Sequence, residues 1–407
     1  MKILRKGINA AMNLKGKITA GVLAILATLG VPGMTEARHH ASEAGSATVV
    51  VSDRQQSGIR HEREVLEDRT RRRVPLANAA KVTAAMRPWK IESQDTGGTL
   101  LFSDSPEYVS EDGILYQDTV QGDARVLYYH LNEMPGPRKV AVVLENMNKD
   151  KAAVVYVTRG AAGQPSADYL KVGKETQTAY FQDQQSKDVL VIPRGDKRLL
   201  REQMGETLLQ QGELVYGVYD FSSETPVKVT VLMYPAHENP YKFVERAKVL
   251  PKDEQRLRGT FKGMDRLISS ERAYNAEKDG VVYFTLADDK KDLFRKGVDA
   301  TDGSSVVNKG NYGILYKIAI PTMGRVSTQY YLTPLGGTYA GAMNVRRDHS
   351  PKTNLLLVPT GTVYFGERPM TDFADLGVYD NRAPSYFEFS PPGASNLPVN
   401  IIMMPAK

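Results

Sequence analysis

The sequence predicts an all-β protein built from two homologous β-sandwich domains in tandem, and three observations support this prediction. From about residue 100 onward, short runs rich in valine, isoleucine and tyrosine alternate with glycine, proline, asparagine and aspartate. Several segments recur in the same order in the two halves of this region. The chain has 407 residues and no cysteine, so each domain must be stabilised by a hydrophobic core without disulfides.

The N-terminal segment 1–37 has the three parts of a signal peptide. Basic residues precede an uncharged apolar run at 18–31, and small residues follow at Thr35 and Ala37. This pattern predicts cleavage after Ala37 and a mature protein outside the cytoplasm that begins at Arg38. The alternative is an uncleaved membrane anchor, which the short apolar run disfavours.

Residues 38–99 are predicted to form a mobile polar tail, because their composition offers little apolar surface to bury. The basic run at 71–73 would either bind an anionic envelope polymer or remain solvated. Trp89, the only tryptophan, falls in this tail. Segments 1–37 and 38–90 carry +4 and +5 of the total charge of +6, which leaves −3 for residues 91–407. This balance argues against nucleic-acid binding by the folded body.

The recurring segments define the two predicted domains, 100–236 and 269–407. The paired segments are 112–116 with 279–283, 127–128 with 315–316, 189–195 with 355–361, 217–220 with 377–380, and 231–236 with 401–406. Residues 292–309 would be an excursion present only in the second copy, and the stretch around 168–181 has no counterpart. At matching positions, Val191 and Leu357 are expected inside, whereas Arg194 and Thr360 are expected to be exposed.

The connection between the copies, 237–268, is predicted to be a helical linker. Asn239 can cap a helix that has Pro240 at its first position, and Pro251 would start or break the next turn. Residues 198–211 are consistent with one more short helix or with an irregular crossing.

The histidines give no sign of a metal site or a catalytic base. His39, His40 and His61 lie in the predicted tail, and the other three, His130, His237 and His349, are far apart in the sequence. His130 falls on a predicted strand, where a hydrogen-bonded structural role is favoured. Motifs for a serine nucleophile, a P-loop and a dinucleotide site are missing. We therefore assign no catalytic, cofactor-binding or metal-binding residue and no cofactor.

Two further patterns have a functional and a structural interpretation. The loop 299–305 resembles a fragment of a calcium loop, but it lacks the third carboxylate and the closing glutamate, which favours a polar turn. Tyr219 and Tyr379, in the repeated Gly-Val-Tyr-Asp segment, would hold their domains together rather than bind a ligand. Asp220 and Asp380 would open the turns that follow.

Segments 105–109, 111–118, 138–145 and 168–173 resemble uncharacterised exported proteins of anaerobic Firmicutes. Some of these proteins are labelled as carrying a copper amine oxidase-like N-terminal domain. The resemblance covers about residues 100–240. The enzymes of that name use three copper-binding histidines and a cofactor tyrosine in an Asn-Tyr-Asp/Glu motif. The nearest string here is 311–313, Asn-Tyr-Gly, so no catalytic residue carries over.

Together these features favour a non-enzymatic protein of the cell envelope or the secreted fraction, which binds or scaffolds a partner such as an envelope polymer or a surface protein. The alternative is an envelope-associated enzyme acting on a glycan or an amine. A pair of carbohydrate-binding modules is disfavoured because the predicted domains contain no tryptophan. A cleft lined by convergent carboxylates or histidines would distinguish the enzyme from the binding protein.

Overall fold

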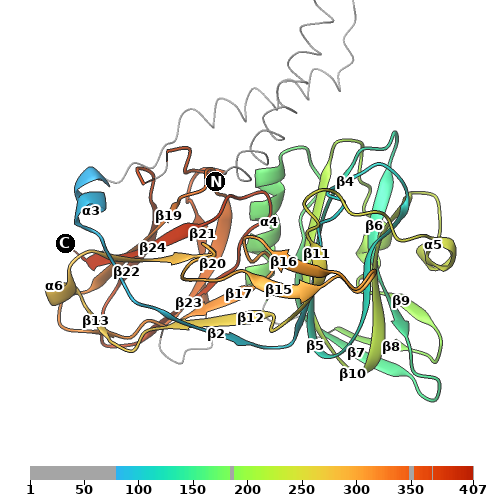
Figure 1. Ribbon diagram of the computed structural model, residues 1–407, viewed down its shortest axis with the longest axis horizontal. Coiled ribbons are helices and arrows are strands. Elements are labelled where there is room, and N and C mark those ends of the chain that lie inside the picture. The colour runs from blue at the N-terminus through green and yellow to red at the C-terminus, as the bar shows by residue number, and fades with distance from the viewer. Residues whose placement is uncertain (1–78, 184–187, 348–352, 369, 407) are drawn as a thin grey trace, which may run out of the picture. The chain divides into compact units, whose positions relative to one another are not determined.

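The structure is a computed structural model that describes residues 79–183, 188–347, 353–368 and 370–406. Strands predominate among its elements, which confirms the predicted all-β class (Figure 1). Up to residue 246 the elements are α3 (Ala79–Ala85), β1 (Arg87–Pro88), β2 (Glu92–Thr96), β3 (Thr99–Ser103), β4 (Tyr108–Val109), β5 (Gly113–Asn132), β6 (Arg138–Asn146), β7 (Ala153–Ala162), α4 (Tyr169–Gln182), β8 (Asp188–Ile192), β9 (Lys197–Leu199), the 3-10 helix η1 (Glu202–Gly205), β10 (Leu214–Pro235) and α5 (Pro240–Arg246).

The second half contains shorter strands. They are β11 (Arg258–Lys262), β12 (Asp265–Ser269), β13 (Tyr274–Asn275), the helix α6 (Ala276–Asp279), β14 (Val282–Leu286), β15 (Arg295–Val298), β16 (Ser305–Asn308), β17 (Leu315–Ile318), β18 (Thr322–Met323), β19 (Thr328–Pro334), β20 (Gly341–Arg347), β21 (Thr353–Val358), β22 (Ala374–Tyr379), β23 (Ser385–Phe389) and β24 (Val399–Pro405). No helix in the described part of the chain is long and apolar enough to cross a membrane.

Two long strands organise the first half. β5 and β10 pair antiparallel along most of their lengths, with a register shift between Ser223 and Val227. Gly122, at the same level of β5, has a φ of 81°, which a side chain would strain. On one side of this irregularity β10 pairs with β6, and on the other side it pairs with β7, which pairs with β8. The two long strands therefore contribute to both layers of one sandwich.

The second half repeats this pairing order with the long strands divided. One sheet of the second half has the neighbour order β14, β24, β19 and β22. This order matches that of the first half, in which the first part of β5 is followed by the last part of β10, β6 and β9. The other sheet has the neighbour order β17, β23, β20 and β21. It matches the last part of β5, the first part of β10, β7 and β8 in the first half. The excursion 292–309 supplies β15 and β16 between β14 and β17, where β5 is continuous.

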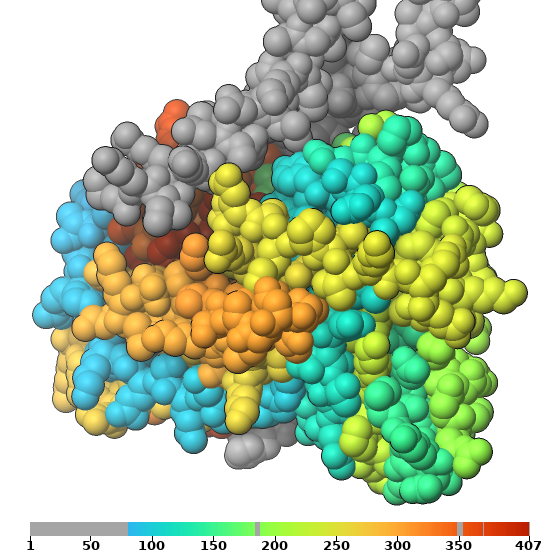
Figure 2. All heavy atoms as spheres, turned by 45° about the vertical axis from the view of Figure 1, so that its right-hand side comes forward, coloured from blue at the N-terminus to red at the C-terminus, as the bar shows by residue number. Residues whose placement is uncertain are grey.

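The two halves exchange strands through a crossed ribbon. β2 pairs antiparallel with β12 in the six-stranded sheet, while β3 pairs antiparallel with β11 in the eleven-stranded sheet. Gly97 and Gly263, with φ angles of 76° and 75°, lie in the two short connections between these strands. The eleven-stranded sheet consequently contains β11, β15 and β16 as well as strands of the first half, and the excursion (orange in Figure 2) lies at the surface.

Several sequence-based boundaries need correction because of this exchange. The predicted tail 38–99 ends in ordered elements, α3, β1 and β2, and Trp89 is buried among core side chains; residues 38–78 lie outside the described part. The predicted linker is helical only in α5, where Asn239 accepts hydrogen bonds from the backbone of Tyr241 and Lys242, and it then contributes β11 and β12 to the sheets. Residues 198–211 form an irregular crossing with the single turn η1.

Burial at the outer strands also differs from the prediction. Val191 and Leu357 are 56% and 36% exposed, because β8 and β21 each pair on one side only and turn these side chains outward. Ile192 and Val358, one residue later, are the buried members of these strands. Arg194 and Thr360 are exposed, as predicted.

Helix α4 is the element of the first half that has no counterpart in the second. Asp168 accepts a hydrogen bond from the Lys171 backbone and caps its N-terminus. The buried side of α4 faces β20: the Gln177 side chain accepts a hydrogen bond from the Ala342 backbone and donates one to the Ser390 carbonyl. In Figure 1 the helix (green) stands beside β20 and β21.

Candidate functional site

A cavity with a volume of about 380 Å³ lies in the sandwich of the first half. It lies between β5, β6, β7 and β10 and is bordered by η1 and the residues that follow it. Its lining consists of Tyr128, Val140, Gly160, Ala162, Gly163, Gln164, Arg201, Gln203, Met204, Thr207, Leu209, Val215 and Tyr219. This size is within the range of small-molecule sites in proteins.

Small side chains keep this space open. Val140 on β6, Gly160 on β7 and Val215 on β10 line the cavity. In the second half, the strands with the same pairing order place Tyr330, Met343 and Phe387 around the corresponding interior.

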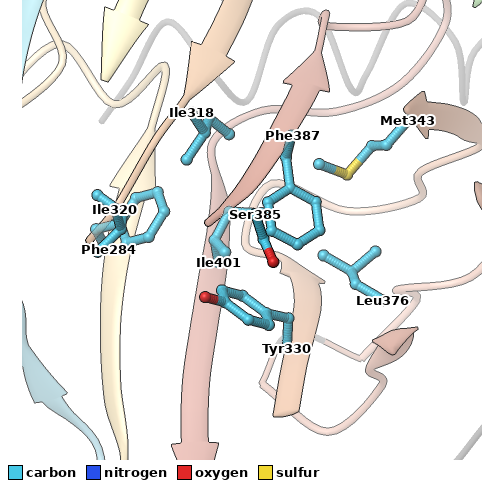
Figure 3. A pocket seen from close by; sticks show the side chains of 9 residues that line it. All are labelled: Phe284, Ile318, Ile320, Tyr330, Met343, Leu376, Ser385, Phe387 and Ile401. Carbon is cyan, nitrogen blue, oxygen red and sulfur yellow. The ribbon is translucent and has the colours of Figure 1, made fainter. Parts of the chain in front are cut away.

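That second interior has a cavity of only about 10 Å³, surrounded by apolar side chains and Ser385 (Figure 3). The centroids of the Tyr330 and Phe387 rings, which line it, are 4.9 Å apart. Such a volume holds about one water molecule at most, so of these two cavities the one in the first half has room for a ligand.

Two tyrosines form one wall of the larger cavity. The rings of Tyr128 and Tyr219 stack with centroids 6.4 Å apart, and their side chains share a hydrogen bond. A Cβ atom on Gly160 would lie 2.1 Å from the Tyr219 ring, so this glycine is required for the ring position. Burial raises the pKa of Tyr128 well above its ordinary value and raises the pKa of Tyr219 to about 12. Both hydroxyls are therefore neutral hydrogen-bonding groups at physiological pH.

Arg201 brings a positive charge to the cavity. Its Nη1 forms an ion pair with Asp188, whose side chain is 57% exposed, while the Arg201 side chain is 17% exposed. Arg201 lies close enough to Tyr219 for its charge to lower the pKa of Tyr219. This effect partly opposes the increase caused by burial. The cavity thus combines apolar side chains with polar ones, which are the two tyrosines, Gln164, Gln203, Thr207 and Arg201.

The residues singled out in the sequence have mostly structural roles. His130 is fully buried; its Nε2 is 2.9 Å from Ser103 Oγ and its Nδ1 is 2.8 Å from the Pro106 carbonyl oxygen. Burial lowers the pKa of His130 to about 4, consistent with the predicted structural role. His237 is exposed, and His39, His40, His61 and His349 lie outside the described residues. Among the described residues, no group of three or more histidine, aspartate or glutamate side chains is arranged so that it could hold a metal ion.

The loop that resembles a calcium site is occupied by basic side chains. The Asp299 carboxylate lies 2.9 Å from Arg258 Nε and 3.3 Å from Lys252 Nζ. Lys252 also pairs with Asp302 at 2.5 Å. Because these cations neutralise both carboxylates, the interpretation as a polar turn is correct.

The repeated Gly-Val-Tyr-Asp segments do not correspond in the structure. Tyr219 lies on β10, which pairs with β5 and β7, whereas Tyr379 lies on β22, which pairs with β19. The Tyr379 hydroxyl donates to the Leu376 carbonyl at 2.8 Å and its ring packs on Phe387, so its role is structural as predicted. Tyr219 is buried as well but lines the cavity.

The aspartates after these tyrosines also differ. Asp380 accepts a hydrogen bond from the Arg382 backbone and opens a turn, as predicted. Asp220 is inside β10 and binds the buried Arg125 through both carboxylate oxygens, at 2.6 and 2.9 Å. The prediction of a turn at Asp220 was therefore wrong.

A cluster of carboxyl groups lies beyond β3, and sequence reasoning did not select it. Burial and the neighbouring charges of Glu107 and Asp253 raise the pKa of Asp104. Burial and the charge of Asp253 raise the pKa of Glu107 to about 7. Asp253 accepts hydrogen bonds from Ser105 Oγ and from the Glu107 backbone, both at 2.9 Å. The 146 residues between Glu107 and Asp253 explain why the sequence alone gave no signal for this cluster.

Comparisons with known proteins add little to this description. No family model and no curated protein matches the sequence. Among solved structures, the chain is similar to a cupin 2 conserved barrel domain protein from Leptotrichia buccalis, with 8% identity, a TM-score of 0.13 and coverage of 82% of this chain and 98% of that one. A 7S globulin of Momordica charantia matches with 12% identity, a TM-score of 0.11 and coverage of 78% and 83%. At these TM-scores the similarity supports no functional inference.

Proposed function

We propose that this chain is an exported, non-enzymatic binding protein whose ligand occupies the cavity of the first half. The observation that carries the proposal is the 380 Å³ space with an apolar floor, the Tyr128–Tyr219 pair and Arg201. A largely apolar pocket with a few placed polar groups is the usual form of a small-molecule site. Export follows from the pattern of residues 1–37 and is part of the proposal.

A thermal-shift screen of small metabolites and envelope fragments tests the binding site. Ala162 is an exposed residue that lines the cavity, so Ala162→Trp should fill the cavity without disturbing the core. Ala152→Trp is the matched control, because Ala152 is exposed just before the start of β7 and does not line the cavity. A ligand of the cavity should raise the Tm of the wild type and of Ala152→Trp but not of Ala162→Trp. An equal shift in all three proteins would exclude the cavity as the binding site.

N-terminal sequencing of the protein from its native host tests export. The mature chain should begin at Arg38, and a cytoplasmic protein that begins at Met1 would contradict the proposed location.

One observation favours a second candidate, an envelope enzyme acting on a glycan. Asp104 and Glu107 have raised pKa values, as a general acid in glycoside hydrolysis requires. Hydrolysis of envelope glycan fragments that is abolished by both Asp104→Asn and Glu107→Gln would support this candidate. Absence of hydrolysis by the wild type would leave binding as the function of the chain.

A further inference from the structure

The chemistry of the cavity indicates what kind of ligand it takes. We propose that the cavity binds a small carboxylate with an apolar or aromatic body, with the carboxylate at Arg201 and the body between Tyr219 and the floor formed by Val140, Leu209 and Val215. This inference rests on the proposed function, since it names the ligand class of the same site.

Arg201 is the cationic group of the lining, and its position favours an anion. A guanidinium has five N–H donors in a planar fork that matches a carboxylate, and the ion pair with Asp188 uses Nη1. With 17% of its side chain exposed, Arg201 is shielded enough from water for a further charge interaction to be significant. Asp188 is more exposed, at 57%, so a ligand carboxylate can share the guanidinium while Asp188 remains hydrated.

One part of the remaining lining favours an apolar body, while Gln164, Gln203 and Thr207 add polar groups beside it. Val140, Leu209 and Val215 are each at most 5% exposed and present only hydrocarbon. Gly160 and Gly163 add no side chain to the wall, and Tyr219 offers a ring face and a hydroxyl. No carboxylate belongs to the lining itself; the nearest ones are Asp188, paired with Arg201, and Asp183, which accepts a hydrogen bond from the Gly160 backbone at 2.9 Å.

Titration calorimetry with paired probes tests the ligand class on the full chain. Benzoate, phenylpropionate and hexanoate are the anions, and benzamide is the neutral partner of benzoate. We expect at least one anion to bind, and benzoate to bind at least tenfold more tightly than benzamide. Arg201→Gln should weaken anion binding tenfold or more and leave any benzamide binding unchanged. Arg201→Lys, which keeps the charge but loses the fork, should be intermediate.

Arg198→Gln is the matched control. Arg198 also pairs with an aspartate, Asp196, at 2.7 Å, but its side chain is 43% exposed and does not line the cavity, so its loss should not change anion affinity. The Tm of each variant confirms that it is folded. The ligand class is wrong if no anion binds, if benzamide equals benzoate, or if Arg201→Gln binds benzoate like the wild type. A neutral screening ligand that is lost in Ala162→Trp would then still support the cavity, so the two proposals fail separately.

Discussion

Removal of the Arg125 side chain should strongly destabilise the protein. Arg125 is 1% exposed on β5, and its Nε and Nη2 bind the Asp220 carboxylate. Its Nη1 donates to the carbonyls of Met264, at 2.7 Å, and Gly313, at 3.0 Å. Asp265 on β12 lies 3.2 Å from Nη2 without hydrogen-bond geometry. Arg125 thus joins the sandwich of the first half to the crossed ribbon and to the second half.

The expected loss follows from the groups that Arg125→Met would leave behind. Asp220 and Asp265 are 8% and 5% exposed, so at least one carboxylate becomes a buried charge with too few partners. Breaking such a buried pair from one side costs about 3–5 kcal/mol. Asp220 retains a hydrogen bond from Tyr180 at 2.8 Å and Asp265 retains Lys317 at 2.6 Å, which favours the lower end of this range.

Urea unfolding followed by circular dichroism measures this loss. The double variant Arg125→Met/Asp220→Leu replaces both charges by apolar groups and should recover part of the stability, because it removes the stranded carboxylate. A loss below about 1 kcal/mol for Arg125→Met would refute the buried network as a main tie between the halves. If the double variant loses more free energy of unfolding than the two single variants lose together, the electrostatic explanation is refuted.

Three further predictions concern single residues. In the folded protein the pKa of Glu107 is raised from its ordinary value of 4.5 to about 7, so the folded state binds this proton more tightly than the unfolded state. The contribution of Glu107 to the free energy of unfolding should therefore be full below pH 4.5. It should fall by roughly 2–3 kcal/mol as the pH rises to about 7. Glu107→Gln should flatten this part of the stability–pH profile, and an unchanged profile would contradict the assignment. Gly160→Ala should cost about 1–3 kcal/mol in urea unfolding because it displaces the Tyr219 ring, whereas an unaffected stability would show that the ring is free to move. Tyr379→Ala should destabilise the chain by about 3 kcal/mol without altering ligand binding at the first-half cavity.

The fold class was predictable because β propensity and turn residues are local signals. Four of the five recurring segments lie on strands with the same pairing order, for example 189–195 at β8 and 355–361 at β21. The strand exchange was not predictable, because β2 pairs with β12 across more than 160 residues and only Gly97 and Gly263 mark the crossing. The exposure of Val191 was missed because the sequence does not indicate that β8 is an edge strand.

The cavity could not be predicted from the sequence, and the reason is physical. It depends on which residues of different strands line one space, such as Val140 on β6 and Val215 on β10, and on the absence of side chains at Gly160 and Gly163. Glycine and valine in strands are ordinary, so their effect becomes visible only when the larger Tyr330 and Phe387 fill the corresponding interior of the second half. Arg201 follows β9, and nothing near it in the sequence indicates a binding site.

A crystal structure of the full chain grown with the best ligand from the screen tests whether the first-half cavity is the binding site. We predict electron density for the ligand inside this cavity, in contact with Tyr219 and Arg201, while the small interior around Tyr330 and Phe387 remains without ligand. Ligand density at any other surface, with the space between Val140 and Tyr219 filled by ordered water, would contradict it.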